Sequence, residues 1–107
     1  MELLTYPDVA EALGLPVTRV HQLVRDGQLL FVQVEQGRRI PADFIQDGQV
    51  VKHLPAVIRL LRDSHYEDGE ILDWLFREDD SLPGTPIGNL RDNRGTEIKR
   101  RAQVAGY

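Results

Sequence analysis

A short predicted helix near the N-terminus carries polar side chains of the kinds that recognise nucleic acid. The helix is expected over residues 17–26, because Val17, Val20, Leu23 and Val24 fall on one side at about 100° per residue. The opposite side carries Thr18, Arg19, His21, Gln22 and Arg25. Arginine pairs with guanine, glutamine with adenine and threonine with either base edge, and arginine also contacts phosphate. The pattern therefore predicts a face that enters a groove of double-stranded DNA.

The alternative interpretation is an ordinary surface helix, because such helices are polar on their outer side. The distinguishing observation is that the polar face has no acidic residue before Asp26, in a chain with 17 acidic residues. The absence of carboxylates favours a surface that meets phosphate, although the pattern alone leaves both interpretations open.

A second basic feature follows this helix. Strand-forming residues fill positions 29–34, a turn with a glycine spans 35–37, and a short return strand over 38–40 ends at Pro41. A hairpin directly after the second helix is a wing, and Arg38 and Arg39 lie near its tip. Wing arginines contact phosphate or the minor groove. A solubilising hairpin tip is the alternative at this position.

Two short helices must position these side chains. The first is expected to begin at Thr5, with Asp8 in capping-box position, and to stop at Gly14. A linker of roughly three residues with a glycine between two short helices is typical of a helix-turn-helix. After the wing, a single helical turn is expected over 41–45, packing Phe44 and Ile45 on the core.

The second half of the chain predicts helices. Apolar residues recur at core spacing over 54–62, and a second helix is expected over 67–76. A loop with two prolines and a brief turn at 87–90 precede a last helix over 97–105, for which Thr96 is the expected N-cap. The chain is therefore predicted to be mainly α with a small β-hairpin wing.

The elements group into two predicted domains. An N-terminal winged helix-turn-helix is expected over residues 1–47 and a small helical C-terminal domain over 48–107, with the boundary in the polar stretch 46–49. Each is near the lower size limit for burying a core of its own.

The helix over 67–76 is apolar around more of its circumference than one buried face needs. In one interpretation the flanking helices bury it completely. In the other, the region of Trp74, Leu75 and Phe76 forms a homodimer or receives a protein partner, with the acidic residues 78–80 at the rim.

The charge balance sets a limit on the predicted DNA affinity. The formal net charge is −4, but residues 67–80 hold seven acidic residues against one arginine, so the remaining chain is net positive. Binding depends on the local field where the surfaces meet. We therefore expect modest affinity for DNA.

The sequence offers no arrangement for catalysis. The three histidines are unrelated in spacing, cysteine is absent, and there is no glycine-rich phosphate loop. We therefore predict that the protein is not an enzyme and has no catalytic residue and no cofactor. We also predict no metal site, since the acidic residues 78–80 lack calcium-loop spacing. Without a long apolar run or signal peptide, the expected location is the cytoplasm, with no membrane partner.

Residues 3–45 resemble the winged helix-turn-helix of the MerR and excisionase type. The first helix of that type has the pattern T-x-x-[DE]-[VA]-A-x-x-L-G, matched here by Thr5, Asp8, Val9, Ala10, Leu13 and Gly14. The exit pattern R-x-G-x-L is matched by residues 25–29, and the arginine-tipped wing by Arg38 and Arg39. The chain lacks the long dimerising helix and effector domain of MerR proteins, so sensing of drugs or metals is not implied.

Over its whole length the chain is similar to small mycobacterial and actinobacterial DNA-binding regulatory proteins, with residues 74–87 carrying much of the likeness. This resemblance implies a bacterial regulator of transcription that binds duplex DNA. A fainter likeness to the toxin-binding domain of antitoxins rests on Trp74, Leu75, Leu90 and Gly95. It implies the alternative function, an antitoxin-like or adaptor module whose C-terminal domain binds a protein.

Overall fold

The computed structural model describes residues 1–106 of the chain. Capping residues determine where its first helix begins and ends. In α1 (Tyr6–Leu13) the Thr5 hydroxyl accepts from the Asp8 amide, while the Asp8 carboxylate accepts from the Thr5 amide, at 3.1 and 3.3 Å. Gly14 ends the helix at φ 67°, in the left-handed region where a glycine has no Cβ to clash. This reciprocal capping box confirms the predicted boundaries of the first helix.

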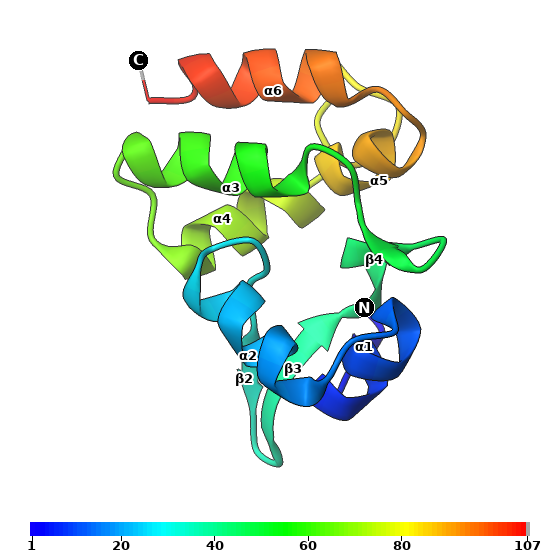
Figure 1. Cartoon of the computed structure of the whole chain (residues 1–107). Helices are drawn as coiled ribbons and strands as arrows, with labels where there is room; N and C mark the ends of the chain where they lie inside the picture. Colours follow the sequence, from blue (N-terminus) through cyan, green and yellow to red (C-terminus); the bar gives the residue numbers. More distant parts are fainter. Residues whose placement is uncertain (107) are drawn as a thin grey trace. The chain divides into compact units, whose positions relative to one another are not determined.

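The second helix and the wing follow in the same compact unit, Met1–Val51 (Figure 1). Helix α2 (Val17–Arg25) packs against α1, and strands β2 (Val32–Val34) and β3 (Gly37–Pro41) form the wing. The fully buried side chains include Val9, Val20, Leu29, Ile40 and Phe44. They come from α1, α2, the loop after α2, strand β3 and the 3₁₀ turn Ala42–Phe44. One core therefore joins α2 and the wing, the two elements that carry the predicted DNA contacts.

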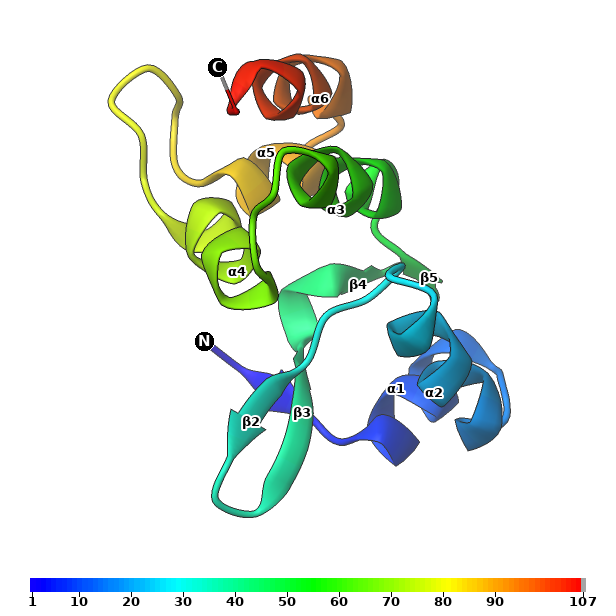
Figure 2. The same ribbon diagram turned by 90° about the vertical axis from the view of Figure 1, so that its left-hand side faces the viewer.

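Short strands complete this unit. β1 (Leu3–Leu4) pairs antiparallel with β3, giving the order β1-β3-β2, and β4 (Ile45–Gln46) pairs with β5 (Gln49–Val50) (Figure 2). The wing register places Gln33 opposite Arg38 and Val32 opposite Arg39. The β4–β5 hairpin occupies the stretch 46–49, which the sequence suggested as a domain boundary, and the structure divides after Val51. Neither hairpin β4–β5 nor strand β1 was expected from the sequence.

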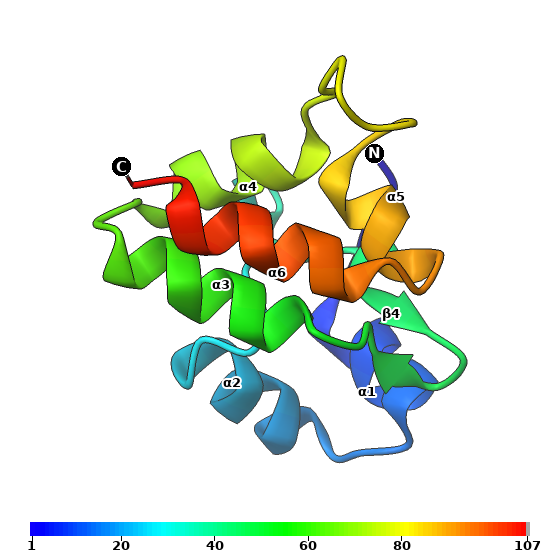
Figure 3. The same ribbon diagram turned by 90° about the horizontal axis from the view of Figure 1, so that it is seen from above.

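The second unit begins at Lys52 and is helical. Helix α3 (Leu54–Asp63) lies beside α6 (Gly95–Val104), and α4 (Asp68–Phe76) and α5 (Pro86–Arg91) complete the bundle (Figure 3). Its fully buried side chains include Leu54, Val57, Ile58, Leu61, Ile71, Leu75, Ile87, Ile98 and Ala102. Each buried aliphatic side chain of this kind contributes about 1.5–3 kcal/mol. Within the described residues no helix is long and apolar enough to cross a membrane.

The start of the last helix differs from the prediction. Thr96 was expected to be the N-cap, but α6 already begins at Gly95, with Arg94 as N-cap and no side-chain capping bond. The turn before it is set instead by Asn93 at φ 64° and by the Arg94 amide, which donates to the carbonyl of Asn89 at 2.9 Å. Gly95 is buried against the His53 ring, which fixes where the helix begins.

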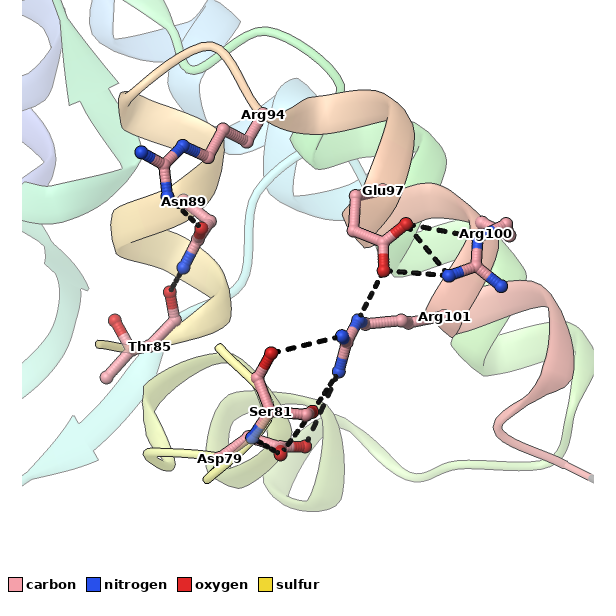
Figure 4. A network of polar contacts seen from close by, with 8 residues as sticks. All are labelled: Asp79, Ser81, Thr85, Asn89, Arg94, Glu97, Arg100 and Arg101. Carbon is pink, nitrogen blue, oxygen red and sulfur yellow. Dashed lines mark hydrogen bonds and ion pairs between the residues drawn. The ribbon is translucent and has the colours of Figure 1, made fainter. Parts of the chain in front are cut away.

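A polar network connects the loop after α4 to α6 (Figure 4). Arg101 donates to the Ser81 hydroxyl at 2.6 Å and to Glu97 at 2.9 Å, and it lies 3.8 Å from Asp79. Hydrogen bonds from Ser81, with the Arg101 charge, lower the pKa of Asp79. Arg100 and then Arg101 lower the pKa of Glu97. The network therefore uses its arginines to hold a loop and a helix together.

Candidate nucleic-acid interface

The predicted recognition face of α2 is open to solvent. Its five candidate side chains, Thr18, Arg19, His21, Gln22 and Arg25, are all exposed. Val20 alone is fully buried in α2, while Leu23 and Val24 are half-buried and Val17 is 37% exposed. The predicted apolar side of this helix is thus only partly covered. Arg19 Nη1 donates to Gln22 Oε1 at 2.5 Å, so these two candidates form one polar pair on the surface.

The wing places its two arginines next to each other along β3. The Arg38 guanidinium lies over the Phe31 ring at 4.2 Å from its centroid, a distance that gives a favourable cation–π contact. Arg39 Nη1 donates to the carbonyl of Arg38 at 2.9 Å. Arg38 is exposed and Arg39 half-buried. Stacking on Phe31 limits the conformations of Arg38 and holds its charge beside the hairpin.

Within residues 1–106, none of the four arginines of this unit, Arg19, Arg25, Arg38 and Arg39, forms an ion pair. The ion pairs of Arg62, Arg77, Arg100 and Arg101 all lie in the second unit. The first unit still contains more acidic residues than arginines, seven against four. These four arginines therefore have no carboxylate partner within 4 Å among the described residues, although the unit contains more acidic residues than arginines.

A hollow of about 350 Å³ joins α2 to the wing. It is lined by Tyr6, His21, Val24, Arg25, Phe31 and Arg38. A neighbouring hollow of about 360 Å³ is lined by Thr5, Tyr6, Pro7, Val17, His21, Arg38 and Arg39. The structure thus brings together His21, Arg25, Arg38 and Arg39 from the predicted set. Thr18, Arg19 and Gln22 lie on the same helix but line neither hollow.

Sequence reasoning missed two aromatic residues at this place. Tyr6 is 7% exposed and packs on the His21 ring, with centroids 4.7 Å apart. Phe31 supports Arg38. The helical pattern gave no signal for Tyr6, because it stands at the first helical position, and Phe31 was counted as a strand residue. In the described part of the chain no group of three or more His, Asp or Glu side chains is placed to hold a metal ion.

Comparison with known proteins gives matches along both units. Residues 1–45 match the family described as "DNA-binding protein Rv2175c, wHTH domain", and residues 51–106 match "Rv2175c C-terminal domain of unknown function". The chain belongs to the Rv2175c family. The protein named DNA-binding protein Rv2175c from Mycobacterium tuberculosis is 40% identical to it over 114 residues. That alignment covers 94% of this chain and 78% of the mycobacterial protein.

The fold is shared with a solved member of the Rv2175c family. The NMR structure of Rv2175c matches this chain with a TM-score of 0.89 and 38% sequence identity, covering 99% of this chain and 82% of that one. Together with the family match over residues 1–45, this confirms the predicted winged helix-turn-helix followed by a helical region. It also agrees with the predicted resemblance to small mycobacterial DNA-binding proteins.

Proposed function

We propose that this protein binds double-stranded DNA through the exposed face of α2 and the wing, and that it regulates transcription. The observation that carries the proposal is the group of arginines on α2 and β3 without a carboxylate partner. Arginines that make no ion pair within the protein need not break one when they meet a phosphate, and their binding releases counterions from the duplex. The names of the relatives, which describe DNA binding, support this function.

The two elements have different proposed roles. Gln22 and Arg25 reach base edges in the major groove, since both are exposed on the outer face of the recognition helix. Arg38 and Arg39 contact the backbone or the minor groove from the wing. Thr18, Arg19 and His21 flank the base-reading residues and contact phosphate or base edges. This docking follows the MerR and excisionase type, which the sequence of residues 3–45 resembles.

The salt dependence of binding tests this proposal. Labelled duplex is titrated with protein at several chloride concentrations, and the slope of log affinity against log salt is measured. We expect a slope that corresponds to only ~3–5 phosphates per subunit, because the face offers few cations. Salt-independent binding, or no binding at low ionic strength, would contradict the proposal. Competition with heparin distinguishes duplex binding from a protein-interaction module without DNA contact.

A second proposed function concerns the C-terminal unit, which we propose forms a homodimer around Trp74. A hollow of about 410 Å³ lies there, lined among others by Tyr66, Trp74, Leu82 and Val104. Val104 is 53% exposed, while Trp74 and Phe76 are half-buried and Leu75 is fully buried. One interpretation of the sequence was that the flanking helices bury this helix completely. Among its apolar residues 71–76, only Ile71 and Leu75 are buried.

The occupant that best fits this hollow is a second copy of the chain. Its lining includes both Arg77 and Arg101 and both Glu78 and Asp79. A surface with both signs can pair with itself across a twofold axis, because each residue then meets its complement in the partner. Sedimentation at ~10 and ~200 µM, which spans modest affinities, tests the dimer. A monomer at both concentrations would contradict it, and a dimer abolished by Val104→Glu with the fold intact would support it.

A further inference from the structure

The hydroxyl of Tyr6 is a buried polar group that has no partner within the protein. The side chain is 7% exposed, and its oxygen is the one buried side-chain polar atom without a hydrogen bond among the described residues. Buried polar groups are normally hydrogen-bonded, because leaving one unpaired carries the full desolvation penalty. A phenylalanine would fill the same space without that penalty. The hydroxyl is therefore unfavourable for the isolated fold, which suggests a role outside it.

The surroundings of Tyr6 point to the kind of group that this hydroxyl meets. Tyr6 lines both hollows between α2 and the wing, together with His21 and Arg38. Arg25 lines one of these hollows and Arg39 the other. Every polar side chain in the two linings can donate a hydrogen bond, and neither lining contains an aspartate or glutamate.

A site in which every polar side chain can donate and no carboxylate is present fits an anion better than a base edge. Base edges in the major groove present both donors and acceptors, whereas a phosphodiester presents acceptor oxygens and a negative charge. Arginine and hydroxyl side chains are regular phosphate ligands in protein–DNA contacts. Here the guanidinium group of Arg38 carries no ion pair within residues 1–106 and borders both hollows together with the tyrosine.

We propose that the space between Tyr6, His21 and Arg38 is the seat of one backbone phosphate of the bound duplex, with the Tyr6 hydroxyl donating to a phosphate oxygen. The inference rests on the proposed DNA binding and adds a contact from α1, which lies outside the recognition helix and the wing. The hydroxyl has almost no exposed surface in the free protein. The side chains that cover it must therefore shift when the phosphate enters.

The Tyr6 contact and an arginine contact should affect the salt dependence of DNA binding differently. A hydroxyl that donates to a charged oxygen adds affinity but displaces no counterion, since it carries no charge. An arginine contact adds affinity and also steepens the salt dependence. Removing the hydroxyl should therefore weaken binding without changing the salt slope, whereas removing Arg38 should change both.

The experiment measures fluorescence anisotropy of a labelled random-sequence duplex of about twenty base pairs with the full-length wild type, Tyr6→Phe and Arg38→Ala. For Tyr6→Phe we expect affinity about tenfold weaker and a salt slope equal to that of the wild type. For Arg38→Ala we expect weaker binding with a slope smaller by ~1. The thermal midpoint of Tyr6→Phe should equal or exceed that of the wild type, because the variant removes an unpaired buried group.

The matched control is Thr85→Val in the second unit. The Thr85 hydroxyl already accepts from the Gly88 amide at 3.1 Å as the N-cap of α5, so this variant should lower the thermal midpoint and leave duplex binding unchanged. Opposite behaviour of the two hydroxyls, one acting on binding and the other on stability, is the expected result.

Three results would overturn the proposal, and they are distinguishable. Wild type that binds no duplex refutes the proposed function itself. Wild type that binds duplex while Tyr6→Phe binds equally well refutes the seat alone. If Tyr6→Phe keeps duplex affinity but loses a stabilisation by inorganic phosphate, measured against chloride at equal ionic strength, the hydroxyl serves a free phosphate and not DNA.

Discussion

Arginines have opposite surroundings in the two units of this protein. In the second unit Arg62 pairs with Asp68 at 2.9 Å, Arg77 pairs with Asp73, and Arg100 and Arg101 share Glu97. In the first unit none of the four arginines has an ion pair within the described residues, although carboxylates outnumber them. Four arginines of the second unit therefore support the fold through ion pairs, whereas those of the first unit make none and three of them are exposed.

This difference shows why net charge is a poor guide to function in this chain. The first unit is net negative by sequence, yet its arginines all lie on α2 and β3, where none of them forms an ion pair within the described residues. Local field, and not total charge, determines where a phosphate can bind. An arginine with a carboxylate partner must break that pair before it can bind DNA, whereas an unpaired one need not.

The largest expected effect comes from Arg25. Replacing it with alanine should cost ~1–3 kcal/mol of binding free energy on the preferred site and flatten sequence preference. Gln22→Ala should act in the same way. The measurement is anisotropy on a site selected from random duplexes and on an unrelated duplex of equal length. In contrast, Arg38→Ala should weaken both duplexes about equally.

The matched control for Arg25→Ala is Arg62→Ala in the second unit. Arg62 is bonded to Asp68 through three hydrogen bonds, and the side chains are 36% and 51% exposed. Its loss should lower stability by no more than ~1 kcal/mol and leave DNA affinity unchanged. Equal losses of affinity from Arg25→Ala and Arg62→Ala would contradict the division between the two units.

A second prediction tests the packing of the C-terminal unit. A Cβ at position 95 would lie 2.2 Å from Cδ2 and 2.9 Å from Cγ of His53. Gly95→Ala should therefore lower the free energy of unfolding by ~1–3 kcal/mol, measured by urea denaturation. The control is Gly69→Ala within α4, where a Cβ meets nothing within 4 Å. It should stabilise by ~0.5–1 kcal/mol, because alanine favours helix. If Gly95→Ala and Gly69→Ala were equally stable, the His53 ring could not be held in place against position 95.

A third prediction concerns the network of Arg101. Arg101→Gln should lower the thermal midpoint at neutral pH more than Arg100→Gln does, because Arg101 also holds Ser81 and Asp79. The pKa values of Asp79 and Glu97 are lowered from 3.8 and 4.5 in the folded protein. Their stabilising effect is therefore complete above those ordinary values and disappears as pH falls through the lowered pKa. The difference in thermal midpoint between Arg101→Gln and wild type should therefore disappear in acid. A difference that persists in acid would show that the stabilisation by Arg101 is not electrostatic.

The smallest predicted effect involves His53. Desolvation, followed by the charges of Lys99 and Lys52, lowers the pKa of His53 from 6.5. The folded state then binds its proton less readily than the unfolded state, so stability should fall as pH drops below 6.5. His53→Asn should remove this dependence while keeping the left-handed backbone at φ 73°, which asparagine tolerates. Thermal unfolding at several pH values between 5.5 and 7.5 provides the comparison, and parallel curves for both proteins would contradict the prediction.

Sequence patterns predicted the elements with strong local signals. The capping pair Thr5 and Asp8, the stop at Gly14 and the hairpin after α2 each follow from interactions between residues close in the chain. The exposure of the polar face of α2 was also predicted, because the periodicity of polar and apolar residues along one helix is a local property of the sequence. The roles of its residues in DNA contact stay predictions.

Features that depend on residues far apart in the chain were not predictable. Strand β1 has two residues and exists because Leu4 pairs with Ile40. Thr96 had the right residue type for a cap, but the turn at Asn93 and the packing of Gly95 on His53 begin the helix earlier. The same limit applies to the candidate site. No local pattern connects Tyr6 with Arg25 and Arg38, which only the tertiary fold brings to one hollow.

The two-residue turn of the wing has a consequence for how this family can diverge. Val34 pairs with Gly37, so Glu35 and Gln36 alone close the hairpin. Side chains alternate between the faces of a strand, and a shift of one residue exchanges every side chain between them. A single-codon insertion or deletion in this turn would thus exchange the positions of Arg38 and Arg39 without altering either residue. Evolution at this hairpin should favour substitutions over changes in length, and homologues with a longer turn should carry their basic residues at shifted positions.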